Sequence, residues 1–328
     1  MAVHLCLLFN ALLRHYFVPD DFRFGIIKPL LKNKHGDHTK VDMYRGITLT
    51  PVFSKLFESV LASLYSSFLY SDHLQFGFKA NSGCNDALFT LMESAQYFNK
   101  RGSKLLCAFL DASKAFDKVL INGLIYKLVR RNVPLHFIRL LFYWFNNLSC
   151  SVVWMMLMSD AFCVSSGVRQ GGVLSPLLFA VYVDDLIAKL RCSGFGIHIG
   201  SLFYGCIFYA DDIALLSCSC YGLQKLLDIC SAYGEEWDIK FNPEKSCVGT
   251  IGGNHLSAKV ELVAKSLQWR DHVKYLGCML RCKSCNVDTS GFVSKFYGAF
   301  NSIMHVLGYK RNEMVAVQLV GSYCLPSL

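Results

Sequence analysis

Long apolar runs are missing from this chain of 328 residues. Its densest apolar stretch, Val152 to Met158, is far shorter than the ~20 residues that a helix needs to cross a bilayer. The N-terminal region also lacks the basic leader and the small-residue cleavage site of a secretion signal. We therefore expect an intracellular protein, in the nucleus and/or the cytoplasm, that is not secreted and has no membrane partner.

Charged residues are scarce as well. They make up 17% of the chain, against 53% hydrophobic and 14% aromatic residues, which excludes the composition of a disordered chain. The length suits roughly two to three packed lobes. The 33 Lys and Arg outnumber the 24 Asp and Glu, giving a net charge of +9. Such a chain attracts polyanions, of which nucleic acid is the commonest, although charge alone is weak evidence.

Regular cysteine spacing is also absent. The 15 cysteines are odd in number and scattered, unlike the framework of a disulfide-stapled secreted module. The tightest cluster is Cys278, Cys282 and Cys285, with one Cys-x-x-Cys pair, whereas a structural zinc usually takes two such pairs. We interpret all the cysteines as reduced thiols and the three of this cluster as small apolar fillers.

The hydrophobic pattern predicts helices, strands and hairpins in alternation, without a repeat of fixed length. Helices are expected over residues 1–17, 51–70, 85–99, 118–131, 135–147, 175–190 and 223–237 and over roughly the last 40 residues. Strands are expected in a basic hairpin over 18–50, at 105–110, across 150–166 and in a hairpin centred on Ala210–Asp211. The natural architecture is α+β, with helices on one face of an antiparallel sheet.

The segment 51–70 has the clearest amphipathic pattern. Six apolar residues at helical spacing form one stripe: Phe53, Leu56, Phe57, Val60, Leu61 and Leu64. We expect this stripe to face the core.

Aspartates stand at the ends of apolar strands at two places. Asp111 follows the strand 105–110, and Asp211 and Asp212 lie between two apolar strands. An Asp-Asp pair in a turn is more often simply solvated, but ionised groups in a core sheet are costly unless paired or metal-bound. Nucleotidyl transfer uses two Mg²⁺ ions about 4 Å apart, and Mg²⁺ prefers carboxylate oxygens. The pattern therefore favours a two-metal site.

Longer motifs surround these aspartates in a fixed order. They are an apolar strand with Asp-x-x-x-x-Phe-Asp, then GVRQGGVLSPLLF, FYADD, FNPEKS and KYLG. This series resembles motifs A to E of reverse transcriptases, and five motifs in order make chance an implausible explanation. Upstream, GIIKPLLKNKHGD, YRGITLTPVFSKLFE and QFGFKANSGCNDALFTL resemble the fingers segments of LINE-type, non-LTR retrotransposon enzymes.

The resemblance implies an RNA-directed DNA polymerase with the right-hand polymerase fold. Its fingers would comprise residues 1–104 and its palm residues 105–285, with some fingers residues within 118–166, and a partial thumb would follow at 286–328. An antiparallel palm sheet would be packed by helices. The partners would be an RNA template, a DNA primer and dNTPs, while the oligomeric state is not specified.

The resemblance also implies the catalytic residues. Asp111, Asp211 and Asp212 would hold two Mg²⁺ ions, for which Mn²⁺ can substitute, and Ala112 would lend a backbone carbonyl. Phe116 would exclude the 2′-hydroxyl of a ribonucleotide, although a core aromatic is the alternative.

Other residues match nucleotide-binding positions of the family. Gln170 and Gly171 match the motif B loop, as does Gly172, where relatives often have another residue. Arg45 matches the fingers arginine that contacts the triphosphate, with Lys32 or Lys34 in support. Relatives commonly have Arg-Pro-Ile where this chain has Arg-Gly-Ile.

Three assignments keep an alternative. Lys245 matches the motif D lysine that acts on the leaving pyrophosphate, but an exposed loop lysine is equally consistent. Tyr275–Gly277 resembles the primer grip, and plain packing is the alternative. Tyr182–Asp185 also has the form Tyr-x-Asp-Asp, but it lies inside a predicted helix, so we exclude it from the metal site and expect its acids on the helix surface.

Two rival functions remain from the sequence. A truncated or decayed retroelement copy could bind nucleic acid without catalysis, and the chain's span suggests a fragment, a truncated copy or a reduced reading frame. The intact Asp111, Asp211 and Asp212 argue against decay. A palm-fold nucleotide cyclase is disfavoured by the Arg169–Gly171 loop and by the basic hairpin.

Overall fold

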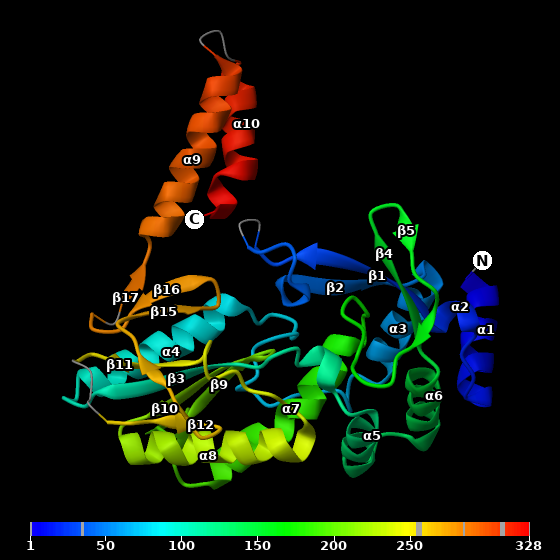
Figure 1. Cartoon of the computed structure of the whole chain (residues 1–328), viewed down its shortest axis with the longest axis horizontal. Helices are drawn as coiled ribbons and strands as arrows, with labels where there is room; N and C mark the ends of the chain where they lie inside the picture. Colours follow the sequence, from blue (N-terminus) through cyan, green and yellow to red (C-terminus); the bar gives the residue numbers. More distant parts are fainter. Residues whose placement is uncertain (1, 34–35, 254–257, 285, 309–311, 328) are drawn as a thin grey trace.

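The structure, a computed structural model, describes residues 2–33, 36–253, 258–284, 286–308 and 312–327. These residues form two sheet regions side by side and a pair of C-terminal helices that rises from one of them (Figure 1). None of the described helices is both long enough and apolar enough to cross a membrane. Lys34 and Cys285 lie outside the described residues.

The first sheet combines two parts of the chain that are far apart in sequence, residues 24–49 and 149–163. Its order is β2-β1-β4-β5, with β6 paired to β4. Its strands are β1 (Phe24–Leu31), β2 (Tyr44–Leu49), β4 (Ser149–Trp154), β5 (Leu157–Met158) and β6 (Phe162–Cys163). The antiparallel pairing of β1 with β2 confirms the basic hairpin. β4 joins β1 in parallel from a later part of the chain.

Helices surround this sheet on the right-hand side of Figure 1. They are α1 (Ala2–His15), α2 (Asp20–Arg23), α3 (Val52–Leu64), α5 (Ile121–Arg130) and α6 (Leu135–Asn146), with a 3-10 turn η1 (Val41–Met43) before β2. In α3 the expected apolar stripe is only partly correct. Phe57 and Leu61 are buried, but Phe53, Leu56, Val60 and Leu64 are exposed. The buried face instead includes Ser54 and Glu58, because α3 packs against polar groups described below.

The central sheet has the order β14-β11-β3-β10-β9. Its strands are β3 (Leu105–Asp111), β9 (Cys206–Tyr209), β10 (Asp212–Ser217), β11 (Cys247–Ile251) and β14 (Gln268–Trp269). All pairs are antiparallel except β11 with β14. β3 lies in the middle of this sheet. Its side chains point alternately to the two faces of the sheet, and both faces are covered.

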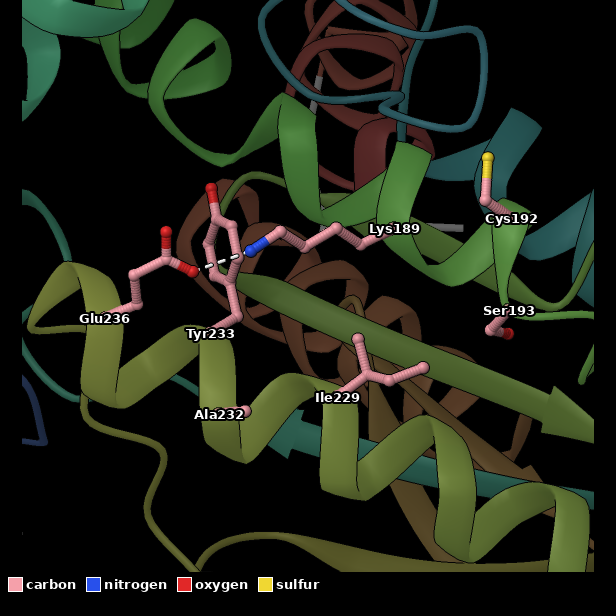
Figure 2. Close-up of a pocket in the computed structure, with 7 residues that line it drawn as sticks. All are labelled: Lys189, Cys192, Ser193, Ile229, Ala232, Tyr233 and Glu236. Atoms are coloured by element: carbon pink, nitrogen blue, oxygen red, sulfur yellow. Dashed lines mark hydrogen bonds and ion pairs between the residues drawn. The ribbon is translucent and has the colours of Figure 1, made fainter.

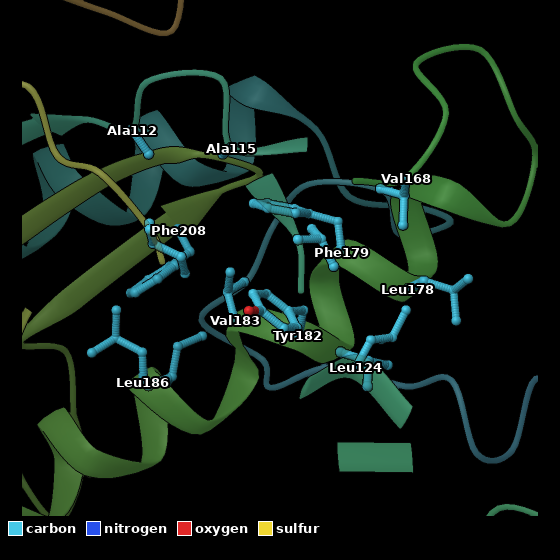
Figure 3. Packing of buried hydrophobic residues seen from close by; sticks show 14 of the residues in the cluster. Ala112, Ala115, Leu124, Val168, Leu178, Phe179, Tyr182, Val183, Leu186 and Phe208 are labelled. Atoms are coloured by element: carbon cyan, nitrogen blue, oxygen red, sulfur yellow. The ribbon is translucent and has the colours of Figure 1, made fainter. Parts of the chain in front are cut away.

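Helices cover both faces of this sheet, so the expectation of helices on one face only was wrong. Leu106, Ala108 and Leu110 share a core cluster with residues of α7 (Ser175–Cys192) and α8 (Cys220–Trp237). On that face, residues of α7 gather beside Ala112 and Phe208 (Figure 3). On the other face, Leu105, Cys107 and Phe109 pack with α4 (Cys84–Asn99). The continuous apolar run at residues 105–110 is typical of a strand buried on both faces, but it does not say which segments cover each face.

Short hairpins and two helices complete the fold. The hairpin strands are β7 (His198–Ile199), β8 (Leu202–Phe203), β12 (Glu261–Leu262), β13 (Lys265–Ser266), β15 (His272–Tyr275), β16 (Cys278–Arg281) and β17 (Asn286–Asp288). α9 (Ser290–Leu307) and α10 (Glu313–Tyr323) pack on each other, followed by η3 (Leu325–Ser327). The helical prediction for this end is confirmed. α9 has no buried residue, in keeping with its position above the sheets (Figure 1).

A lysine lies inside the core between α5, α7 and α8. The Lys127 side chain is only 1% exposed, and its Nζ lies 3.3 Å from Asp185 Oδ2. Nζ donates to the carbonyl of Tyr182 at 2.5 Å and to the Tyr233 hydroxyl, and it sits 3.9 Å from the Trp237 ring centroid. Burial lowers the pKa of Lys127 from 10.5 to about 8. The fold therefore carries a buried cation at neutral pH.

We predict that Lys127→Met removes a pH dependence of stability. The folded pKa of about 8 lies below the value of 10.5 for an accessible lysine, so between these values the unfolded chain binds more protons than the folded one. Stability from this group therefore rises with pH in that window. The free energy of unfolding of the wild type, relative to Lys127→Met, should increase by about 2–3 kcal/mol from pH 8 to 10. Urea titrations of both proteins would measure this, and parallel pH profiles would contradict it.

Candidate active site

A tight turn presents Asp211 and Asp212 at the end of the central sheet. We call residues Tyr209–Asp212 the aspartate turn; it links β9 to β10, with Tyr209 paired to Asp212. Ala210 adopts a left-handed conformation with φ of 58°. β10 also pairs with β3, and there Asp212 lies directly opposite Asp111. This pairing places their Cα atoms about 5 Å apart. The hairpin centred on Ala210–Asp211 is thus confirmed.

The three carboxylates act on one another electrostatically. Burial, and then the charge of Asp111, raise the pKa of Asp211. Burial, followed by the charges of Asp211 and Asp111, raises the pKa of Asp212 to about 6. The Arg45 guanidinium lowers both pKa values by a smaller amount. Negative charge is therefore concentrated here, and a cation at this position would relieve it.

The chemistry of these oxygens fits a hard divalent cation. Among the described residues, however, no group of three or more Asp, Glu, His or Cys side chains is arranged to hold a metal ion by itself. That is compatible with Mg²⁺, which usually takes one or two carboxylates and completes its coordination with water and substrate phosphates. The three carboxylates are thus chemically suited to a divalent cation that completes its coordination with other ligands.

The loop before β11 lies against Asp111. The Asp111 carbonyl accepts from Asn242 N at 2.9 Å, and its N–H donates to Ser246 Oγ at 3.2 Å. Ala112 forms an isolated bridge with Phe241. Lys245 Nζ lies 3.9 Å from Asp111 Oδ2, with the lysine side chain 63% exposed. Lys245 is therefore both a loop lysine and a neighbour of the carboxylates.

Phe116 begins a 3-10 turn, η2 (Phe116–Lys118), just after β3. Its ring stacks on Phe179 of α7, with centroids 4.5 Å apart and planes at 17°. Phe78 meets it edge-on at 5.8 Å and 86°. Phe116 is half-buried, so one part of the ring packs in the core and the rest is exposed to solvent.

The loop before α7 is tied to the first sheet. Thr48 N of β2 donates to the Gln170 carbonyl at 2.7 Å, and the Gln170 amide donates to Asp117 Oδ1 at 2.8 Å. Gly171 has φ of 121°, and a Cβ there would lie 2.5 Å from the Thr48 carbonyl oxygen. Only glycine allows this approach. Asp117 therefore holds the Gln170 side chain.

Sequence reasoning missed Glu58. This buried carboxylate of α3 pairs with Arg169 at 3.1 Å and accepts N–H donors from Val173 and Leu174 at the start of α7. An added Cβ at Gly172 would come within 3.0 Å of Glu58 Oε2. Glu58 is a polar residue beside the predicted apolar stripe. Ser54 and Glu58 are four residues apart and so share one helix face, and this polar pair was the only signal in the sequence for a polar buried face.

The second Tyr-x-Asp-Asp sequence lies within α7, as expected, and not in a turn. Asp184 pairs with Arg131 at 2.5 Å and Asp185 with Lys127 at 3.3 Å. The expected surface position is correct for Asp185, which is 45% exposed, but wrong for Asp184, which is 15% exposed. Asp184 is covered because it also accepts from Asp72 N at 2.6 Å.

The remaining predicted residues lie around this centre. Arg45 is exposed on β2, and Lys32 Nζ donates to the Asp42 carbonyl at 2.9 Å. Tyr275–Gly277 forms the turn between β15 and β16. The Tyr275 ring is buried beside Phe109, with centroids 5.1 Å apart. This side chain therefore packs in the core, while Gly277 of the turn is exposed.

A hollow of about 450 Å³ lies elsewhere, between α7 and α8 (Figure 2). Its lining includes none of the predicted site residues. Its carboxylate, Glu236, is paired with Lys189 at 2.6 Å, so this hollow does not supply a second metal-binding group.

Comparison with known proteins gives one consistent family. The model of the family "Reverse transcriptase (RNA-dependent DNA polymerase)" matches residues 32–280. The "Probable RNA-directed DNA polymerase from transposon BS" of Drosophila melanogaster is 31% identical, over 85% of this chain and 32% of that protein. The RNA-directed DNA polymerase from mobile element jockey, from the same organism, is 28% identical over 84% of this chain and 31% of its own length. The chain thus spans about a third of these relatives.

The fold agrees with this family. A solved structure of apo telomerase from Candida tropicalis matches with a TM-score of 0.58 and 14% identity, covering 97% of this chain and 61% of that one. At that identity the likeness shows the fold alone, which is the expected right-hand polymerase fold. The chain belongs to the reverse transcriptase family, and its relatives place it in the LINE-type, non-LTR retrotransposon branch.

Proposed function

We propose that this chain is the catalytic core of an RNA-directed DNA polymerase that adds nucleotides to a primer 3′-hydroxyl by a two-metal mechanism. The observation that carries the proposal is the meeting of Asp111, Asp211 and Asp212 at one end of the central sheet, where burial and mutual repulsion raise the pKa of the last two. Family membership supplies the choice of reaction. The partners would be an RNA template, a DNA primer and dNTPs.

The carboxylates of Asp111, Asp211 and Asp212 and the carbonyl of Ala112 would hold the ions. Two Mg²⁺ ions, or Mn²⁺ in their place, would activate the primer hydroxyl and stabilise the leaving pyrophosphate. Arg45 would pair with the triphosphate through its guanidinium, which already influences both aspartates of the turn. Lys245, beside Asp111, would neutralise or protonate the pyrophosphate.

The loops around the carboxylates would select the nucleotide. Gln170 and Gly171 form a backbone surface fixed to β2, against which the incoming base would lie. Phe116, braced by Phe179, would block the 2′-hydroxyl. In this scheme residues 1–104 act as fingers, 105–285 as the palm and 286–328 as part of the thumb, inside the nucleus or the cytoplasm.

We predict that Asp211→Asn reduces DNA synthesis by about 10³-fold or more, because the reaction loses a charge in contact with its ions while side-chain volume hardly changes. The measurement is primer extension on an RNA template with Mg²⁺ or Mn²⁺. Asp21→Asn is the matched control, since that acid is exposed on α2 and lies outside the proposed site, and it should keep most of the wild-type rate. Equal rates for Asp211→Asn and wild type would sink the assignment.

The same assay separates catalysis from simple binding. A decayed copy would bind nucleic acid without extending any primer. In that case neither the wild type nor Asp211→Asn would show primer extension.

We predict that Phe116→Val raises the incorporation of ribonucleotides relative to deoxyribonucleotides by about 10–100-fold, the usual value of one lost steric contact in a pocket. The readout is the ratio of kcat/KM for matched ribo- and deoxyribonucleotides. Phe142→Val, at an exposed ring of α6, is the control and should leave the ratio unchanged. An unaltered ratio in folded Phe116→Val would show that Phe116 is a packing residue only.

A further inference from the structure

A segment outside motifs A to E, at the start of the fingers-like sequence QFGFKANSGCNDALFTL, holds the aspartate turn. Residues Leu74–Phe78, which we call the clamp segment, run beside β9. Gln75 forms a parallel bridge with Phe208. Phe208 N donates to the Leu74 carbonyl at 2.8 Å, and Phe76 N donates to the Phe208 carbonyl at 2.8 Å. The clamp segment thus extends the edge of the central sheet next to the turn.

The Gln75 side chain reaches from this segment into the turn. Gln75 is fully buried. Its Oε1 accepts from Ala210 N at 3.0 Å and from Gly77 N at 2.9 Å, and its Nε2 donates to the Ala210 carbonyl at 3.5 Å. One amide side chain therefore engages both polar backbone groups of Ala210.

Ala210 needs such an external partner. Its φ of 58° is a left-handed conformation, which costs a residue with a Cβ roughly 1 kcal/mol or more. The strain persists only where the surroundings enforce it. Gly77 shows how close the enforcing segment comes, because a Cβ there would lie 2.6 Å from Ala210 N.

We propose that Gln75 is a positioning residue for the metal-binding carboxylates. It fixes the peptide groups of Ala210 and thereby the directions in which Asp211 and Asp212 leave the turn. This inference rests on the proposed function in one respect, that these carboxylates bind the divalent cations.

The far end of the clamp segment meets the proposed sugar gate. Phe78, itself at φ of 62°, packs edge-on against Phe116. The same short segment therefore braces the aspartate turn at one end and the ring proposed to inspect the sugar at the other.

The test measures binding of Mn²⁺ alone, by electron paramagnetic resonance titration, so that it does not depend on polymerase activity. Gln75→Met keeps length and volume but loses every hydrogen bond to the turn, and Gln75→Glu keeps the acceptor for Ala210 N. Leu61→Ala, in the buried face of α3, is the control for general destabilisation. The Mn²⁺ binding that is lost in Asp211→Asn is the binding at the aspartate turn.

We expect Gln75→Met to weaken the Asp211-dependent Mn²⁺ affinity by about 10-fold, the usual effect of losing a group that orients a metal ligand. Gln75→Glu should stay within about 3-fold of wild type, and Leu61→Ala should lower the melting temperature without changing the affinity. If Gln75→Met does not fold, Gly77→Ala gives the same test, because its Cβ displaces Ala210 N.

Unchanged Mn²⁺ affinity in a folded Gln75→Met or Gly77→Ala protein overturns the inference, even if the wild type makes DNA. So does the absence of any Mn²⁺ binding that Asp211→Asn removes. Weakened Mn²⁺ affinity in Gln75→Met together with no DNA synthesis by the wild type would refute the proposed function and leave the positioning role intact.

Discussion

The pairing of Asp111 with Asp212 across β3 and β10 is the constraint on which the rest of the site depends. It brings partly buried carboxylates together at the end of the central sheet, where burial and their mutual repulsion raise the pKa values of Asp211 and Asp212. Arg45 reduces this repulsion only in part. The remaining negative charge is therefore favourable for a cation. Because β3 is also paired with β11, the loop that carries Lys245 must lie beside Asp111.

The two sheet regions meet through backbone contacts at the loop before α7. Thr48 binds the Gln170 carbonyl, and Gly171 lies against Thr48 at a distance that no side chain could tolerate. Glu58 then holds the start of α7 while pairing with Arg169. Removing one partner of such a buried pair typically costs about 3–5 kcal/mol. The position of this loop is thus fixed by the packing of α3, far away in sequence.

Two Asp-Asp sequences in one chain show how context decides the role of a dipeptide. Asp211 and Asp212 end up beside Asp111 because short apolar strands flank them. Asp184 and Asp185 lie in α7, where Arg131 and Lys127 neutralise them. The buried cation Lys127 in turn requires an acid nearby, since an unpaired charge in the core would be far more costly. Ion pairing therefore gives the second pair a structural role.

The sequence by itself determined the elements, the β3 and hairpin positions of the aspartates, and the family, because apolar periodicity and motif order are local properties of the chain. It predicted Asp111, Asp211 and Asp212 as neighbours, since strand ends of one sheet meet. Only the tertiary structure decided that the sheet is covered on both faces, that Glu58 is buried, and that Gln75 holds Ala210. The roles of Glu58 and Gln75 depend on hydrogen bonds between residues more than 100 positions apart, and a polar side chain in a helix or loop carries no local signal of the distant backbone group that it will bind.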